Sequence, residues 1–155
     1  MSVFIRNSEI HDAAYLAPRL REIDIQEIYC TTLLPPLEAL EQAYNTSDIC
    51  QTAVVKGAPI AMFGAAVVPW GAVPWLLGTP DIVTVKLSMA KLSNKWVNDW
   101  VQTYGLLKNY VHSSNEVSIR WLQDHLEFTM ASEPTFFNHQ PFLAFERSHL
   151  CAIPL

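Results

Sequence analysis

Apolar and polar residues alternate near the amino terminus and then recur at helical spacing, which predicts a strand followed by a helix. The alternation lies in "SVFIR", residues 2–6. A helical pattern follows over residues 13–28, and Asn7 or Ser8 can cap its start. Pro18 is expected to interrupt or kink this run, because proline lacks the amide hydrogen that a helix interior needs.

The middle of the chain predicts a second helix, three strands and a long helix. "LEALEQAY", residues 37–44, has a helical pattern. Residues 52–68 indicate a hairpin that turns at "KGA", and "PWLLGT", residues 74–79, indicates another buried strand. Apolar residues then recur every four positions, so residues 88–104 predict a helix, which Gly105 ends.

The last third of the chain predicts a strand, a helix and two closing strands. The strand is "LLKNYVH", residues 106–112, and the closing strands are residues 129–137 and 141–148. Ser113 and Glu116 have the spacing of a capping box that opens the helix. The whole order predicts an α/β fold in which helices cover a mixed sheet.

Composition favours one domain over residues 1–155, because no repeat or linker divides the chain. Half of the residues are hydrophobic and 16% are charged, so a large core is expected. The net charge of -5 argues against nucleic-acid binding, which needs a basic surface. The cysteines Cys30, Cys50 and Cys151 are widely spaced and odd in number, which fits a reducing cytoplasm without disulfides.

One uncharged segment, Ala58–Gly78, has about the length that spans a bilayer. Pro59, Pro69 and Pro74 would break a helix there. Two buried strands with a proline-rich connection explain the same residues, so we expect no membrane span.

Three stretches, in this order of elements, resemble the GNAT (Gcn5-related N-acetyltransferase) family. They are "LREIDIQEIY" with Arg21, Asp24 and Glu27, "GAPIAMFG", and "NYVHSSNEVSIRWL", residues 109–122. More narrowly, the chain is similar to acetyltransferase-like proteins of short-tailed bacteriophages, including those called internal virion protein A. The resemblance implies a mostly antiparallel sheet whose fourth and fifth strands splay apart to hold acetyl-CoA.

The resemblance also implies that backbone N–H groups at the start of the third helix bind the cofactor's pyrophosphate. The family's Arg/Gln-x-x-Gly-x-Gly/Ala loop is missing here, because residues 79–93 contain no glycine. Three lysines at positions 86, 91 and 95 form either a compensating phosphate site or a solvated face. The cofactor-binding residues implied in this chain are Leu77, Gly78, Thr79, Lys86, Ser88, Lys91 and Asn115.

Few residues of the chain are candidates for a catalytic acid or base. The resemblance implies a proton-donating tyrosine seven residues after Asn115, but Leu122 stands there and has no proton to give. The remaining candidates are His112, which could act as a base near neutral pH, and Asp81. His112 could equally be a polar end group of its strand. No spacing of histidines, cysteines and carboxylates indicates a metal site.

Three hypotheses follow from the resemblance and its departures. The first is transfer of an acetyl group from acetyl-CoA to an amine. The second is a catalytically degenerate protein that binds and modulates a host bacterial protein, and a virion component is a third idea. Trp70 and Trp75, if exposed with Phe136 and Phe137, would form an apolar patch for a partner or a homodimer. The resemblance implies a location in the host cytoplasm or packaging in the virion.

Overall fold

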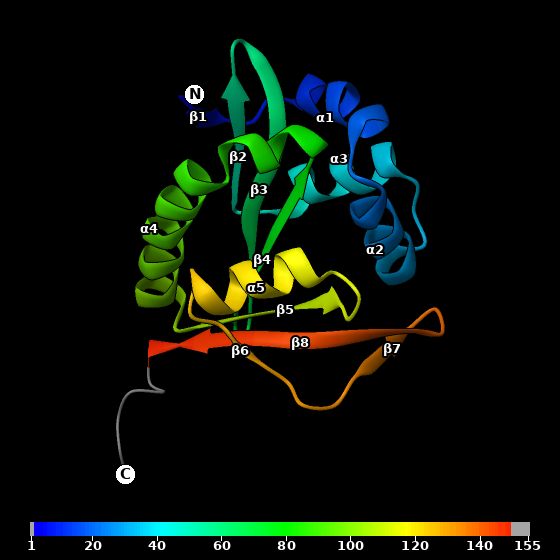
Figure 1. Ribbon diagram of the computed structural model, residues 1–155, viewed down its shortest axis with the longest axis vertical. Coiled ribbons are helices and arrows are strands. Elements are labelled where there is room, and N and C mark those ends of the chain that lie inside the picture. The colour runs from blue at the N-terminus through cyan, green and yellow to red at the C-terminus, as the bar shows by residue number, and fades with distance from the viewer. Residues whose placement is uncertain (1, 150–155) are drawn as a thin grey trace. The chain divides into compact units, whose positions relative to one another are not determined.

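The computed structural model describes residues 2–149, and its contacts divide the chain into two compact units (Figure 1). The first unit consists of residues 2–66 and 75–89, and the second of residues 67–74 and 90–149. The prediction of one domain over residues 1–155 remains a prediction. Cys151 lies outside the described residues.

The first unit contains an antiparallel sheet. In it, β1 (Phe4–Asn7) pairs with β2 (Ile49–Val55), which pairs in turn with β3 (Ala58–Val68). The β2–β3 turn consists of Lys56 and Gly57, whose φ angles of 51° and 79° are typical of a tight two-residue hairpin. The predicted hairpin is therefore confirmed.

The helices of the first unit share a core with this sheet. They are α1 (Ile10–Leu16), the 3-10 turn η1 (Ala17–Arg19), α2 (Glu22–Thr32) and α3 (Pro36–Thr46). Leu16, Ile28 and Leu40 are buried in one cluster with Met62 of β3. Because these side chains come from all three α-helices and from the sheet, their burial fixes the helices on it.

Pro18 separates α1 from α2 as predicted, but the predicted cap of the first helix is wrong. The N-cap is Glu9 rather than Asn7 or Ser8, and its backbone N–H donates to Asp12 Oδ2 at 2.8 Å. The hydroxyl of Ser8 lies 2.8 Å from that of Thr52 instead.

The remaining elements are β4 (Gly71–Gly78), the 3-10 helix η2 (Pro80–Val85), α4 (Lys86–Tyr104), β5 (Leu106–His112), α5 (Glu116–Asp124), β6 (Thr129–Met130), β7 (Thr135–Phe137) and β8 (Gln140–Ser148). Of these, η2 lies in the first unit and the others belong partly or wholly to the second. β4 begins in the second unit and ends in the first, and η2 runs without a break into α4.

The second unit has a mixed sheet, visible in Figure 1 around the long strand β8. The start of β4 runs parallel to β5, with Ala72 opposite Leu107. β5 and β8 are antiparallel along their lengths, from Leu106 opposite Ser148 to His112 opposite Phe142. β6 and β7 are short and both pair with β8.

The two faces of this second sheet differ. Leu107 and Val111 are buried on the face where Arg147, opposite Leu107, donates to Asn98 of α4. Lys108 and Tyr110 point to the other face, because successive side chains of a strand alternate. That second face carries an open pocket.

The predicted mixed α/β fold and the order of its main elements are confirmed. The segment Ala58–Gly78 forms β3 and β4, as expected from its prolines. Among residues 2–149, no helix combines the length and the apolar character that crossing a membrane requires. The run predicted as one closing strand, residues 129–137, forms two short strands, β6 and β7.

Candidate functional site

The nine residues predicted for the site fall in both units. Leu77, Gly78, Thr79, Asp81, Lys86 and Ser88 belong to the first unit, and Lys91, His112 and Asn115 belong to the second. Each of these residues is therefore described within its own unit.

Gly78 ends β4 with both of its backbone groups bonded to the start of α2. Its N–H donates to Asp24 Oδ2 at 3.0 Å, and its oxygen accepts from the Arg21 N–H at 2.9 Å. The resemblance had implied that Gly78 binds the cofactor. In the structure its N–H and carbonyl are both already bonded to residues of the first unit.

An ion pair holds this junction together. The guanidinium of Arg21 donates twice to the Asp24 carboxylate, at 3.0 and 2.9 Å. The Asp24 side chain is 3% exposed, so burial raises its pKa, while the bonds from Arg21 and Gly78 act in the opposite direction. The buried pair makes the end of β4 a fixed point in the first unit.

Leu76 occupies the same edge of β4 as Gly78, since backbone groups in a strand alternate in direction. Residues at the alternate positions direct their backbone groups to the opposite edge, toward β3. Thr79 is one of these, because its N–H donates to the Ile60 oxygen of β3 at 2.8 Å. Leu76 therefore presents its N–H and carbonyl on the edge away from β3.

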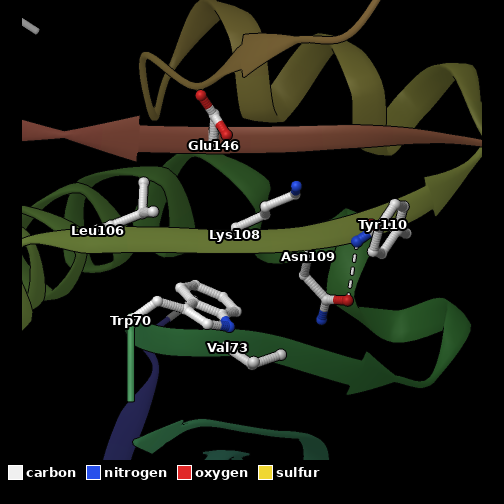
Figure 2. Close-up of a pocket in the computed structure, with 7 residues that line it drawn as sticks. All are labelled: Trp70, Val73, Leu106, Lys108, Asn109, Tyr110 and Glu146. Carbon is white, nitrogen blue, oxygen red and sulfur yellow. Dashed lines mark hydrogen bonds between the residues drawn. The ribbon is translucent and has the colours of Figure 1, made fainter. Parts of the chain in front are cut away.

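In the second unit, β4 and β5 stop pairing soon after Ala72 and Leu107. The side chain of Asn109 lies at that point. Its Nδ2 donates to the Pro74 oxygen at 2.7 Å, and its Oδ1 accepts from the Tyr110 N–H at 2.7 Å, the bond dashed in Figure 2. Pro74 has no N–H with which to continue the ladder. A side-chain amide thus replaces backbone pairing at this point of the second unit.

The region predicted to bind pyrophosphate is helical rather than an open loop. η2 starts right after Thr79, whose hydroxyl accepts from the Asp81 N–H at 3.2 Å and whose carbonyl accepts from the Ile82 N–H at 3.1 Å. These two amides are therefore used within the chain. Lys86 and Lys91 are exposed on α4, Ser88 is half-buried, and Asp81 is exposed in η2.

His112 is buried, at 5% exposure, with both ring nitrogens bonded. Nδ1 accepts from the Ser114 N–H at 3.0 Å and lies 2.7 Å from the Ser114 hydroxyl. Because a backbone N–H can only donate, the proton of the neutral ring is on Nε2, which donates to Gln140 Oε1 at 3.0 Å. The geometry is that of a histidine tying the end of β5 to the turn that follows it and to the first residue of β8, and its catalytic role stays a prediction.

Asn115, not Ser113, is the N-cap of α5. Its Oδ1 accepts from the Ser118 N–H at 3.3 Å, so the predicted capping box is wrong. Asn115 is itself 6% exposed. Leu122, in the position of the implied tyrosine, is buried at 9% exposure and gives α5 an apolar inner face.

Sequence reasoning missed Asn109 and the pocket beside it. The signal for Asn109 was present, because asparagine is depleted in strands and here sits in the middle of one. The two tryptophans considered for an exposed apolar patch differ in exposure. Trp70 is 48% exposed, whereas Trp75 is half-buried and donates to the Ser47 hydroxyl at 2.8 Å.

Several solved proteins have this architecture. Ard1 from Thermoplasma volcanium matches with a TM-score of 0.73 at 12% identity, over 96% of this chain and 98% of that one. A GNAT-family acetyltransferase from Streptococcus pneumoniae gives 0.68 at 16% identity, over 95% and 99%. Spermidine N-acetyltransferase from Vibrio cholerae, solved with CoA and spermine, gives 0.67 at 13% identity, over 94% and 95%.

The fold is therefore that of the GNAT acetyltransferases, as the sequence had predicted. No protein-family model matches the chain, and no curated protein matches it in sequence. The narrower resemblance to phage proteins, with the host or virion location that it implies, stays a prediction.

Proposed function

We propose that this protein binds acetyl-CoA along the edge of β4 and transfers the acetyl group to an amine. The fold is shared with acetyltransferases, some of them solved with CoA, such as the Vibrio cholerae enzyme. The observation that carries the proposal is the backbone of Leu76, which lies on the edge of β4 away from β3, between Pro74, whose carbonyl Asn109 bonds, and Gly78, whose N–H Asp24 bonds.

An extended ligand arm can pair with such an edge as an added strand would. In this arrangement the Leu76 N–H donates to the thioester carbonyl oxygen. The negative charge that develops on that oxygen during attack is then met by a fixed donor. Because Gly78 is already bonded to Asp24, Leu76 is the donor we assign in this part of β4.

The phosphates of the ligand require positive charge, since the usual glycine loop is missing. Lys86 and Lys91 supply it from exposed side chains on α4. Side-chain ammonium groups are screened by salt more than buried backbone amides are. Binding is therefore expected to weaken as the salt concentration rises.

The reaction is direct attack by a neutral amine on the thioester carbonyl. The new N–C bond forms, the C–S bond breaks, and CoA leaves as a thiolate. Leu122 cannot protonate that thiolate, so its proton comes from solvent water, which also takes the proton released by the amine. We expect slow turnover, because Leu122 stands where an acid would assist the departure.

A second candidate is a protein that binds the cofactor or a host protein without catalysis. The buried Leu122 and the doubly bonded ring of His112 favour it, because neither offers a free acid or base. The two candidates differ in whether a thiol is released.

The test has two parts. Thermal unfolding at millimolar acetyl-CoA should show stabilisation, about 2.7 kcal/mol when the ligand is a hundredfold above its Kd. A thiol-release assay over a panel of amines then separates catalysis from binding alone. No thermal response to acetyl-CoA would contradict the proposal, and a response without thiol release would favour the second candidate.

A further inference from the structure

The second unit contains a pocket of about 440 Å³ on one face of its sheet, away from α4. Figure 2 shows its lining, which comes from the β3–β4 turn and from β4, β5 and β8. The lining residues are Trp70, Val73, Leu106, Lys108, Asn109, Tyr110 and Glu146.

Two aromatic side chains form walls of this pocket. The backbone beside Trp70 is constrained, because the next residue, Gly71, lies against β5: an added Cβ there would lie 2.1 Å from the Leu106 oxygen. The Tyr110 ring packs edge-on against the Phe137 ring, with centroids 5.0 Å apart. A ring that is already ordered by such packing costs a ligand little conformational entropy on binding.

The pocket also carries one charge of each sign. Lys108 and Glu146 lie directly opposite each other on β5 and β8. In the part of the chain that the structure describes, neither forms an ion pair. The Lys108 ammonium lies 5.8 Å from the centre of the Tyr110 ring, at the outer limit of a cation–π contact.

We propose that this pocket binds a free α-amino acid with an apolar side chain. Lys108 would take the ligand's carboxylate and Glu146 its ammonium group, as charge-assisted hydrogen bonds. The apolar side chain would pack on Trp70 and the aliphatic groups of Val73 and Leu106.

Other small ligands fit this combination less well. A simple cation meets the unneutralised charge of Lys108, and a simple anion meets that of Glu146. A hydrocarbon would leave both charges beside an apolar body and gain nothing from them. A zwitterion with an apolar side chain uses both charges and the apolar part of the lining.

This inference does not depend on the proposed acetyl transfer, and its test needs no cofactor. L-Phenylalanine, N-acetyl-L-phenylalanine and L-phenylalaninamide share one side chain and differ in charge. Calorimetric titration of the whole chain should give an affinity for L-phenylalanine at least tenfold above that of either analogue. Indole N–H signals in NMR, with Trp70→Phe to identify the Trp70 signal, should show that signal shifting on titration.

Two variants test the roles of the charges. Glu146→Gln should lower the affinity for L-phenylalanine and raise that for N-acetyl-L-phenylalanine, an anion that has no ammonium group and is repelled by the Glu146 carboxylate. Lys108→Met should lower the affinity for L-phenylalanine and raise that for L-phenylalaninamide, a cation that is repelled by the Lys108 ammonium group. Glu133→Gln and Lys56→Met make the same changes at exposed positions outside the pocket and should leave the affinity for L-phenylalanine unchanged.

The proposal is overturned if L-phenylalanine shows no saturable binding, or if all three compounds bind equally. It is also overturned if the two control variants lose as much affinity as the two pocket variants. Circular dichroism and thermal unfolding of each variant establish that the fold is intact, so that a loss of affinity is read from folded protein only.

Discussion

The side-chain nitrogen of Asn109 donates a hydrogen bond to the backbone oxygen of Pro74 at 2.7 Å. The oxygen of the same carboxamide accepts from the Tyr110 N–H, also at 2.7 Å. One side chain therefore satisfies a carbonyl of β4 and an amide of β5 where direct pairing of these strands has ended. The sheet of the second unit can open at this point without leaving those two backbone groups unbonded.

Replacing Asn109 should be costly for that reason. Asn109→Leu leaves the Pro74 carbonyl and the Tyr110 N–H without their partner, and we expect a loss of about 1–3 kcal/mol in the free energy of unfolding by urea. Asn94→Leu is the matched control, because that amide on α4 makes no hydrogen bond that the structure records among residues 2–149. Equal losses in the two variants would show that the carboxamide does not bridge the strands.

Gly71 should tolerate no side chain. Its φ of 154° is in a range that L-residues rarely adopt, and an added Cβ would meet the Leu106 oxygen at 2.1 Å. Gly57 also has a positive φ, 79°, but open space around it. We expect Gly57→Ala to cost about 1 kcal/mol from backbone strain alone. Gly71→Ala should cost clearly more in the same urea experiment, and equal costs would contradict the close approach of β4 to β5.

The ion pair at the end of β4 should be important for the stability of the first unit. Asp24→Ala leaves the guanidinium of Arg21, which is 17% exposed, without a counter-charge and the Gly78 N–H without an acceptor. Breaking a buried pair in this way costs about 3–5 kcal/mol. Glu22→Ala, an exposed residue on the same helix, should stay within about 1 kcal/mol of the unchanged protein. Similar losses in both variants would rule out the buried pair as the cause.

Asp12 should make the protein less stable in acid. Burial opposes the charge on this carboxylate, but hydrogen bonds from Arg6, the Glu9 N–H and Thr52 outweigh it and lower the pKa of Asp12 from 3.8 to about 2. A lowered pKa contributes stability above pH 3.8, and that contribution is lost as the pH falls to about 2.

The contribution of Asp12 amounts to about 2 kcal/mol, at 1.36 kcal/mol for each pKa unit. Free energies of unfolding should be measured from pH 6 to pH 2. For the unchanged protein they should decrease between pH 3.8 and about pH 2. The fall should be smaller by about that amount in Asp12→Asn, which does not titrate. An equal pH dependence in the two proteins would contradict the lowered pKa.

The fold could be predicted from the sequence because its local signals agree with its packing. The spacing of apolar residues predicts α4, and Lys56 with Gly57 predicts the turn between β2 and β3. In both places the tertiary contacts favour the same local structure. The helix caps were less predictable. Ser8 and Ser113 both suit an N-cap, but Glu9 and Asn115 hold those positions, and the Ser8 hydroxyl bonds Thr52 from a distant part of the chain.

The site could be predicted less well, because its properties depend on contacts between distant residues. Nothing in "PWLLGT" shows that the N–H of Gly78 is bonded to Asp24 on α2. Nothing in "LLKNYVH" shows that His112 is bonded to Gln140, far along the chain. Leu76, whose backbone carries the proposed function, has no chemical signal in its side chain at all.

Calorimetric titration of acetyl-CoA into the unchanged protein, Leu76→Pro and Leu76→Ala tests the proposed function most directly. Proline removes the Leu76 N–H on the strand edge without removing a donor to β3, whereas alanine removes the side chain and keeps the N–H. With unfolding measurements to establish that each variant is folded, Leu76→Ala should bind within about threefold of the unchanged protein and Leu76→Pro at least tenfold more weakly, about 1.4 kcal/mol. Equal binding by the two variants, or no binding by the unchanged protein, would contradict the account.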